Sequence, residues 1–278
     1  MTNQKVAIVT GSSSGIGYET ALLLARNGFR TYATMRNLKK AKDISEIAKK
    51  EQLDLHTVEL DVTNEKSVNK AIKNIKSDAG RIDVLVNNAG YGLTGSLEDL
   101  SMNEIKEQYE TNVFGLIRVT QAVLPTMREQ KSGIVVNISS IGGKMAMPLS
   151  SPYIGTKFAV EGLSESIAYD LEPFGIKIII IEPGAIKTNF GTGMVVAEKN
   201  LNPSSPYFKG MQQLQSTLNG LLKSGTPPVK VAEVILNAIT TPSPNLRYTV
   251  GDDAALLAQK RKELGDPEFQ KFVSGFFK

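Results

Sequence analysis

Short apolar runs rich in β-branched residues recur along the chain and alternate with longer segments whose apolar residues repeat at helical spacing. The short runs predict strands buried on both faces, and the longer segments predict helices that cover them. This alternation is typical of repeated β-α-β units around a parallel sheet. The predicted strands cover residues 6–10, 31–36, 55–60, 84–87, 134–138, 177–182 and 247–250.

Six segments at helical spacing lie between these strands, each long enough to cover a sheet face. The pattern predicts one α/β domain over residues 1–278, doubly wound, with a seven-stranded parallel sheet and helices on both faces. Such sheets bind ligands beyond the carboxyl ends of their strands, so residues directly after strands are the first candidates for a site. The predicted helices cover residues 16–27, 41–50, 65–79, 103–127, 154–171 and 229–238.

Residues 189–228 form the one long region without this rhythm, and they are rich in Gly, Ser, Asn and Pro. Their apolar content is nevertheless too high for a plain linker. A mobile lid over a ligand is our prediction, and a locally packed helical insertion is the alternative. The apolar residues of the region are Phe190, Met194, Val195, Val196, Tyr207, Phe208, Met211 and Leu214.

Composition narrows the class of protein. The 278 residues include no Cys, which excludes disulfides, Cys-ligated zinc and a thiol nucleophile, and suits a reducing cytoplasm. The few polar residues before the apolar run at residue 6 leave no room for a signal peptide. Residues 176–181, the longest apolar stretch, fall far short of the roughly 20 residues of a membrane span. We therefore expect a cytoplasmic protein without a membrane span.

The net charge of +4 comes from scattered Lys residues rather than from one block, so we expect no nucleic-acid partner. We expect no metal site either, because no His or carboxylate cluster has ligand spacing. The lone His56 lies at the start of a predicted strand and is expected to be structural.

The first predicted strand runs directly into a turn of sequence Thr-Gly-Ser-Ser-Ser-Gly-Ile-Gly and then into a helix. Gly11 permits a tight turn, Gly15 lets the backbone approach a pyrophosphate, and Gly17 permits close packing of the helix against the strand. The helix start supplies amide donors and the positive end of a dipole. We expect a dinucleotide phosphate at this turn.

The spacing Gly-x3-Gly-x-Gly resembles the main branch of the short-chain dehydrogenase/reductase family, which carries Thr-Gly-x3-Gly-Ile-Gly at this place. The resemblance spans roughly residues 5 to 190 and implies a Rossmann-type fold that binds a nicotinamide dinucleotide. It assigns this turn to the cofactor through Gly11, Ser13, Ser14, Gly15, Ile16 and Gly17.

Arg36 ends the second predicted strand, where an NAD site usually places a carboxylate for the ribose hydroxyls. Met35 stands at the expected carboxylate position, and a guanidinium can bind a phosphate with two hydrogen bonds. Similar NADP-preferring members carry an Arg here. We therefore expect NADP(H) rather than NAD(H), the alternative being that Arg36 only caps a solvated turn.

The ends of the third and fourth predicted strands also resemble the family's pattern. There the family presents an Asp side chain and a backbone amide to the adenine ring, which implies these roles for Asp61 and Val62. The family's Asn-Asn-Ala-Gly turn stabilises the central sheet and lines the cofactor, which implies contacts from Asn88, Ala89 and Gly90.

Tyr153 and Lys157 are four residues apart at the start of a predicted helix, so they share one face. A nearby ammonium favours the phenolate, and we expect Lys157 to lower the pKa of Tyr153. With the glycine turn upstream, the pair resembles the family's catalytic Tyr and Lys, which also contact the cofactor. The family's catalytic serine lies thirteen residues before the tyrosine, which selects Ser140 rather than Ser139.

Asn112, within the predicted helix 103–127, matches an Asn that in many family members kinks the helix and holds a water linked to the lysine. A hydrogen bond between helices is the alternative. After the sixth predicted strand, the family's Pro-Gly motif and the residues that follow contact the nicotinamide. The resemblance extends this role to Pro183, Gly184, Ile186 and Thr188.

Together these motifs imply an NADP(H)-dependent oxidoreductase that interconverts a carbonyl and an alcohol by hydride transfer, with Tyr153 as general acid/base. A regulatory protein that senses NADP(H) with a decayed site is an alternative. An epimerase or dehydratase of the extended branch would carry Gly-x2-Gly-x2-Gly, which is absent here. The apolar residues of 189–228 and the stretch 247–251, which resembles members acting on steroids or retinoids, indicate a moderately apolar substrate.

Members of this branch are often homodimers or homotetramers joined through the crossover helices predicted here at 103–127 and 154–171, and we expect the same. Phe269, Phe272, Phe276 and Phe277, near the end of the chain, close a pocket, pack at a subunit interface or cover the core. We favour an interface or core role.

Overall fold

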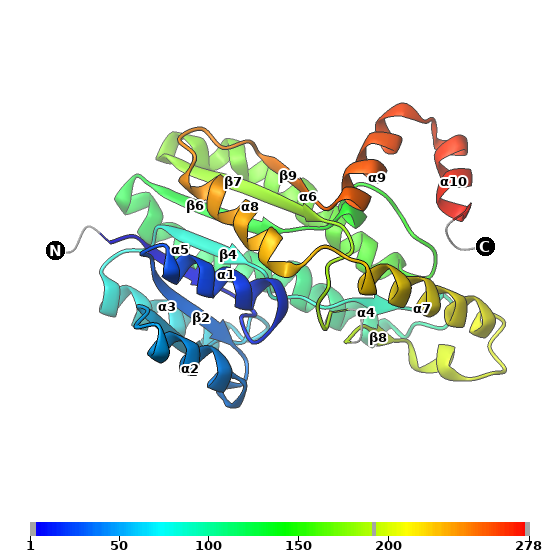
Figure 1. Cartoon of the computed structure of the whole chain (residues 1–278), viewed down its shortest axis with the longest axis horizontal. Coiled ribbons are helices and arrows are strands. Elements are labelled where there is room, and N and C mark those ends of the chain that lie inside the picture. The colour runs from blue at the N-terminus through cyan, green and yellow to red at the C-terminus, as the bar shows by residue number, and fades with distance from the viewer. Residues whose placement is uncertain (1–3, 191–192, 276–278) are drawn as a thin grey trace.

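Side chains along the central strands point alternately to the two faces of one parallel sheet. In β1 (Val6–Val9), Ala7 and Val9 belong to one apolar core, whereas Val6 and Ile8 belong to the other. All four are buried, which explains why the sequence of the strand is continuously apolar. The computed structural model describes residues 4–190 and 193–275 and is shown in Figure 1.

The main sheet has seven parallel strands in the order β3-β2-β1-β4-β6-β7-β9. The order reverses between β1 and β4, which is where doubly wound sheets bind ligands. The seven-stranded sheet predicted from the sequence is therefore confirmed, and no strand end differs by more than one residue. The other strands are β2 (Arg30–Met35), β3 (Leu55–Glu59), β4 (Val84–Asn87), β6 (Gly133–Ile138), β7 (Ile176–Pro183) and β9 (Arg247–Val250).

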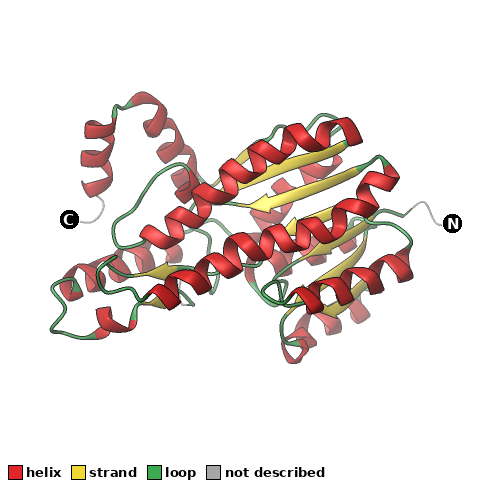
Figure 2. Ribbon diagram, turned by 180° about the vertical axis from the view of Figure 1, so that it is seen from behind, coloured by secondary structure: helices red, strands yellow, loops and turns green. Residues whose placement is uncertain are grey.

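Helices cover both faces of this sheet (Figure 2). α1, α2 and α8 contribute to the core on one face, and α3, α5 and α6 contribute to the core on the other. Local signals set their ends: Asn64 accepts a hydrogen bond from the Ser67 amide where α3 begins, and Gly80 ends it with a φ of 74°. These helices are α1 (Gly15–Arg26), α2 (Lys42–Lys50), α3 (Glu65–Ala79), α5 (Gly115–Gln130), α6 (Ser151–Leu171) and α8 (Pro228–Thr240).

The helix predicted over 103–127 is not a regular α-helix throughout. It consists of α4 (Met102–Tyr109), a π-helical segment η2 (Glu110–Phe114) and α5. A π-helical turn adds one residue to the helical register, and such turns are frequent at functional sites. Here the turn contains the buried Asn112.

Several elements beyond the carboxyl ends of the main strands were not predicted. β5 and β8 pair as a small parallel sheet, and α7 lies within the region 189–228, so that region contains regular structure. Figure 1 shows α7, α9 and α10 at the end of the molecule opposite the N-terminus. The unpredicted elements are β5 (Leu93–Thr94), β8 (Val195–Val196), α7 (Phe208–Lys223), α9 (Asp252–Glu263), α10 (Asp266–Gly275), and the short helices η1 (Leu38–Ala41), η3 (Ile141–Gly143), η4 (Glu172–Phe174) and η5 (Glu198–Leu201).

α9 and α10 pack against η3 and the residues after it. Phe269 is buried in a cluster with Ile141 and Met145, and Phe272 is partly buried against the same cluster. Phe269 therefore has a core role, which is one of the two roles that we favoured. Phe276 and Phe277 lie outside the described residues.

A chain of buried polar side chains fastens α5 and α6 to the middle of the sheet. Asn87 on β4 donates to Thr120 Oγ1 on α5 and to Asn137 Oδ1 on β6, both at 2.9 Å. Asn137 in turn donates to Ser164 Oγ on α6 at 2.8 Å. All four residues are buried away from water. These hydrogen bonds therefore satisfy polar groups that water does not reach.

We predict that Asn137→Ala lowers the free energy of unfolding by about 2–3 kcal/mol, because it leaves the buried Asn87 amide and the Ser164 hydroxyl without this partner. Urea denaturation followed by circular dichroism measures the change. The exposed Asn103 on α4 is the control, and Asn103→Ala should change stability by less than about 0.5 kcal/mol. Equal effects of the two variants would contradict the prediction.

Candidate active site

The turn between β1 and α1 has the shape that its glycines require. Gly11 has a φ of 68° and Gly15 a φ of 62°, in the left-handed region that favours glycine. A Cβ at Gly17 would overlap the Asn88 amide and lie 2.7 Å from the Gly11 carbonyl oxygen. The turn can therefore keep its close packing only with glycine at these positions.

This turn is joined to the turn after β4. Asn88 Nδ2 donates to the carbonyl oxygens of Thr10 at 2.9 Å and Gly11 at 3.1 Å. Thr10 Oγ1 accepts from the backbone amides of Asn88 and Ala89. Asn88 and Ala89 thus hold the glycine turn, and Gly90 follows as an exposed residue of the same edge.

The start of α1 meets the requirements of an anion site. Ser14 is its N-cap, and its side chain makes no capping hydrogen bond to the first helical amides. Amides at a helix start bind phosphate well because they lack intrahelical acceptors and lie at the positive end of the helix dipole. Ser13 and Ile16 lie on either side of Ser14 and Gly15 in the same turn. A dinucleotide pyrophosphate fits this arrangement.

Arg36 is exposed directly after β2 and makes no hydrogen bond or ion pair within the described residues. Burial raises the pKa of the Tyr91 phenol, and the positive charge of Arg36 opposes part of that rise. Asp61 follows β3; its Oδ1 accepts hydrogen bonds from the Thr63 amide and hydroxyl. The next residue, Val62, is buried. Arg36 can therefore bind a phosphate without first breaking an ion pair.

Tyr153 and Lys157 lie one turn apart near the start of α6, and both are buried. Lys157 Nζ donates to the Ile138 carbonyl oxygen, at the end of β6, at 2.9 Å, and lies 5.7 Å from the centre of the Tyr153 ring. Ser140 follows β6 by two residues, and its Oγ accepts from the Gly142 amide at 3.0 Å. The Ser140 hydroxyl lies close enough to the Tyr153 phenol to lower its pKa. The structure thus brings the three predicted residues together.

Electrostatics at this site differ from our expectation. Burial raises the pKa of Tyr153, and the nearby Ser140 hydroxyl opposes that rise only in part. The net lowering of the Tyr153 pKa that we predicted from Lys157 is therefore wrong, because burial is the dominant influence on this phenol. Burial also lowers the pKa of Lys157 to about 8, against the opposing effect of Glu161.

Asn112 makes three hydrogen bonds. Its Oδ1 accepts from the Tyr91 amide at 3.1 Å, and its Nδ2 donates to the Tyr91 carbonyl oxygen at 2.9 Å and to Thr156 Oγ1 at 3.2 Å. The bond to Thr156 joins η2 to α6. It is the hydrogen bond between helices that we gave as the alternative role of Asn112. Thr156, the partner of Asn112 on α6, directly precedes Lys157 in the sequence. Asn112 itself makes no direct hydrogen bond to Lys157.

The segment after β7 runs back over the glycine turn. A Cβ at Gly15 would lie 3.3 Å from Thr188 Cγ2, so Thr188 faces the start of α1. Pro183 ends β7, and the Ala185 amide beyond it donates to Asp253 Oδ2 at 2.6 Å. Asp253, whose carboxylate also packs directly against Gly184, was not predicted, because no sequence signal connects residues so far apart. The Ile186 side chain belongs to the core, which leaves only its backbone for a cofactor.

A hollow of about 470 Å³ lies beside the start of α6. Phe190 stands 6.0 Å from the Tyr153 ring, measured between ring centres, and is 40% exposed. Of the residues that line the hollow, sequence reasoning singled out only Tyr207. The hollow is lined by Gly95, Ser96, Leu97, Glu98, Leu149, Ser151 and Tyr207.

His56 lies away from this site. Its ring stacks on Tyr32 at 5.3 Å and its Nε2 is 2.7 Å from Asp54 Oδ1. No group of metal-ligating side chains occurs among the described residues. Within the same part of the chain, none of the helices combines the length and apolar character that a membrane span requires.

Comparison with known proteins agrees with this geometry. A family model described as short chain dehydrogenase matches residues 5–198. The 17-beta-hydroxysteroid dehydrogenase type 1 of Homo sapiens is 36% identical over 278 residues, which cover 97% of this chain and 84% of the relative.

Two solved structures show the same fold. A short-chain dehydrogenase from Streptomyces avermitilis is 36% identical, with a TM-score of 0.80 and 98% of each chain covered. The structure of ElxO with NADP bound is 30% identical, with a TM-score of 0.73, and covers 89% of this chain and 97% of ElxO. The chain belongs to the short-chain dehydrogenase family, a family of oxidoreductases that act on carbonyls and alcohols through a nicotinamide cofactor.

Proposed function

We propose that the protein is an NADP(H)-dependent oxidoreductase that interconverts a carbonyl and an alcohol, with Tyr153 as general acid/base. The observation that carries this proposal is the meeting of Ser140, Tyr153 and Lys157 in one buried site. The nicotinamide, when bound, supplies or accepts the hydride. The residues of the chain bind the reacting oxygen and move its proton.

Tyr153 and Ser140 have separate tasks in this proposal. Ser140 lies within hydrogen-bonding reach of the phenol, so both hydroxyls can bind one carbonyl oxygen. Because burial raises the pKa of Tyr153, the phenol holds its proton at neutral pH and has it available to donate in the reductive direction. Lys157 places an ammonium charge 5.7 Å from the centre of this ring. A charge there favours the phenolate once the proton has left.

The cofactor preference in this proposal depends on Arg36. Its exposed guanidinium makes no ion pair within the described residues and stands at the end of β2, where the ribose of a dinucleotide is expected. Met35 before it is buried and apolar, so no carboxylate at that position would repel a phosphate. The NADP bound by the 30% identical ElxO supports the same preference.

Residues 189–228 are proposed as the substrate lid. The two ends of the region lie side by side, because Thr226 exchanges backbone hydrogen bonds with Ala185 and Lys187. Between these ends, the pairing of β8 with β5 anchors the segment near the site. The exposed Phe190 over Tyr153 and the leucines that line the hollow favour a moderately apolar substrate.

A homodimer or homotetramer through α5 and α6 is part of the proposal. Phe158 and Tyr169 on α6 are large and exposed, as is Phe114 immediately before α5. Exposed aromatic side chains of this kind are typical of subunit interfaces. The cytoplasmic location expected from the sequence stays a prediction.

We predict that Tyr153→Phe lowers kcat for carbonyl reduction by at least about 100-fold, because the phenyl ring carries no proton to donate. NADPH oxidation against a panel of apolar ketones and aldehydes measures this loss. Tyr169→Phe removes the same hydroxyl from an exposed position on the same helix and should leave kcat unchanged. Undiminished carbonyl reduction by Tyr153→Phe across the panel would show that the assignment of Tyr153 as general acid/base is wrong.

We predict that Arg36→Ala raises the Kd for NADPH by about 10- to 100-fold, because a charged hydrogen-bonded contact to the phosphate is lost. The Kd for NADH should change by less than about threefold, since that cofactor lacks the 2′-phosphate. Fluorescence titration of each cofactor measures both constants. Arg128→Ala, at an exposed position near the end of α5, is the control. Tighter binding of NADH than NADPH by the unaltered protein would contradict this assignment.

A further inference from the structure

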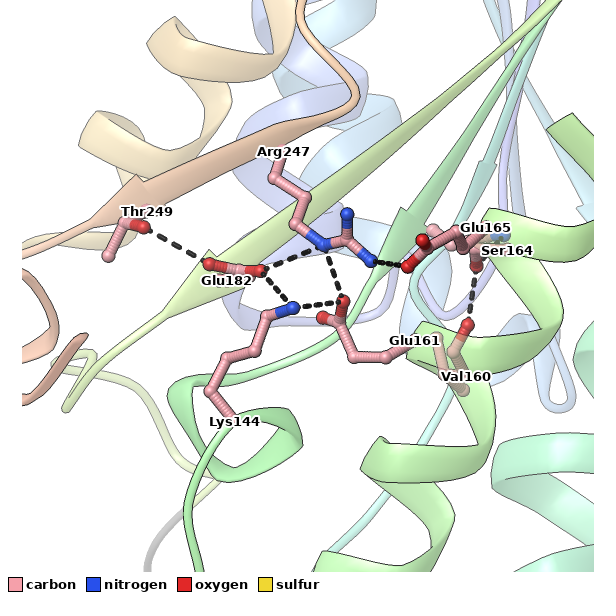
Figure 3. Close-up of polar contacts among 9 residues, drawn as sticks. Lys144, Val160, Glu161, Ser164, Glu165, Glu182, Arg247 and Thr249 are labelled. Atoms are coloured by element: carbon pink, nitrogen blue, oxygen red, sulfur yellow. Dashed lines mark hydrogen bonds and ion pairs between the residues drawn. The ribbon is translucent and has the colours of Figure 1, made fainter. Parts of the chain in front are cut away.

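Five charged side chains meet between β7, β9 and α6 (Figure 3). We call them the charge cluster. They come from four separate segments of the chain. The members are Lys144, Glu161, Glu165, Glu182 and Arg247.

Glu161 is the central carboxylate of the charge cluster. Its Oε2 lies 3.0 Å from Arg247 Nε and 3.2 Å from Lys144 Nζ. Glu182 Oε1 lies 3.6 Å from each of the same two cations, and its Oε2 accepts from Thr249 Oγ1 at 3.1 Å. Two cations are thus shared between two carboxylates.

Both of these carboxylates are buried, with 7% of the Glu161 side chain and 4% of the Glu182 side chain exposed. Glu161 Oε1 has no hydrogen-bond partner among the described residues. Burial of a carboxylate is costly unless charges compensate it, so retention of Glu161 in the ionised form requires its cations. A neutral or apolar side chain would fill this place at lower cost in stability.

Two members of the charge cluster, Glu161 and Lys144, are tied to parts of the active site. Glu161 follows Lys157 by one turn of α6. Lys144 ends the short helix that begins after Ser140. A Cβ at Gly143 would lie 2.8 Å from Glu161 Cγ and 3.1 Å from the Lys157 carbonyl oxygen, so this loop packs tightly on α6 at Glu161.

We propose that Glu161 is a positioning residue for Lys157: its buried carboxylate, held by Lys144 and Arg247, keeps the Lys157 side chain charged within an apolar site. The inference rests on the proposed function, in which the charge of Lys157 assists Tyr153. The charge cluster and Lys157 together contain three cations and three carboxylates, so their charges balance only when Glu161 is ionised.

The direction of the shifts agrees with this role. Burial lowers the pKa of Lys157 to about 8, and Glu161 opposes that effect. The other titratable groups around the pair are Tyr153 on α6, Tyr109 of α4, whose hydroxyl lies against Gly155, and the remaining members of the charge cluster. Burial and the nearby Glu161 raise the pKa of Glu182, so Glu182 is the weaker source of negative charge.

The test is a titration of Lys157 in the full chain labelled with carbon-13 at lysine Cε, with Lys157→Arg to assign the signal. The NMR shift, followed from about pH 6 to about pH 11, gives the midpoint of ammonium deprotonation. We expect Glu161→Gln to lower this midpoint by about one pH unit, and Glu161→Asp to restore most of it. An unchanged midpoint in Glu161→Gln would overturn the proposal.

Glu165→Gln is the matched control, because it removes the same charge from the next turn of α6 and from the same partner, Arg247. It should move the midpoint by less than half as much; an equal movement would overturn the specific role of Glu161. Lys144→Gln tests for a movement of the Lys157 midpoint in the opposite direction. It also takes the place of Glu161→Gln if that variant does not fold. It should raise the midpoint, because Arg247 still holds Glu161 in its ionised form while one positive charge near Lys157 is removed, and a lower or unchanged midpoint would also overturn the proposal.

Kinetics separate this inference from the proposed function. In Glu161→Gln, the fall of kcat at alkaline pH should move to lower pH together with the Lys157 midpoint. If the midpoint moves and the kcat profile does not, the role of Lys157 in the proposed function is wrong while that of Glu161 stands. If the midpoint does not move, Glu161 has no such role, whatever the kinetics show.

Discussion

The hydrogen bond from Lys157 Nζ to the Ile138 carbonyl oxygen joins α6 to the end of β6 at the point where the reacting groups meet. It satisfies a buried ammonium that would otherwise be costly to remove from water. Because Ser140 follows Ile138 by two residues and Tyr153 precedes Lys157 by one turn, this single bond fixes the spacing of all three side chains. The site depends on a charged group kept inside the protein.

Two sets of contacts maintain that arrangement from opposite sides. On one side, the buried chain through Asn137 and Ser164 holds α6 on the sheet without any net charge. On the other, the charge cluster around Glu161 supplies negative charge one turn from Lys157 and fastens the loop after Ser140. Neutral hydrogen bonds thus define position, and ionised groups define the electrostatic environment.

The sheet and the motif residues could be predicted because their signals are local. Strands buried on both faces leave continuous apolar runs, and Tyr153 and Lys157 are a fixed number of residues apart. The pairing of β5 with β8 could not be predicted, since two residues show no periodicity. Contacts such as Asp253 with the Ala185 amide join distant segments. The direction of the Tyr153 pKa was predicted wrongly because burial, which the spacing of residues does not reveal, outweighs the nearby ammonium.

The central claim is that the site transfers a hydride between a nicotinamide and a carbon atom while the chain handles only the proton. Reduction of an apolar ketone with NADPH deuterated at the transferred position of C4, followed by mass spectrometry of the alcohol, tests it most directly. The account predicts one deuterium on the carbinol carbon of the product and none on its exchangeable hydroxyl. Product alcohol formed without that deuterium, or oxidation of NADPH with no alcohol formed from any ketone or aldehyde, would contradict it.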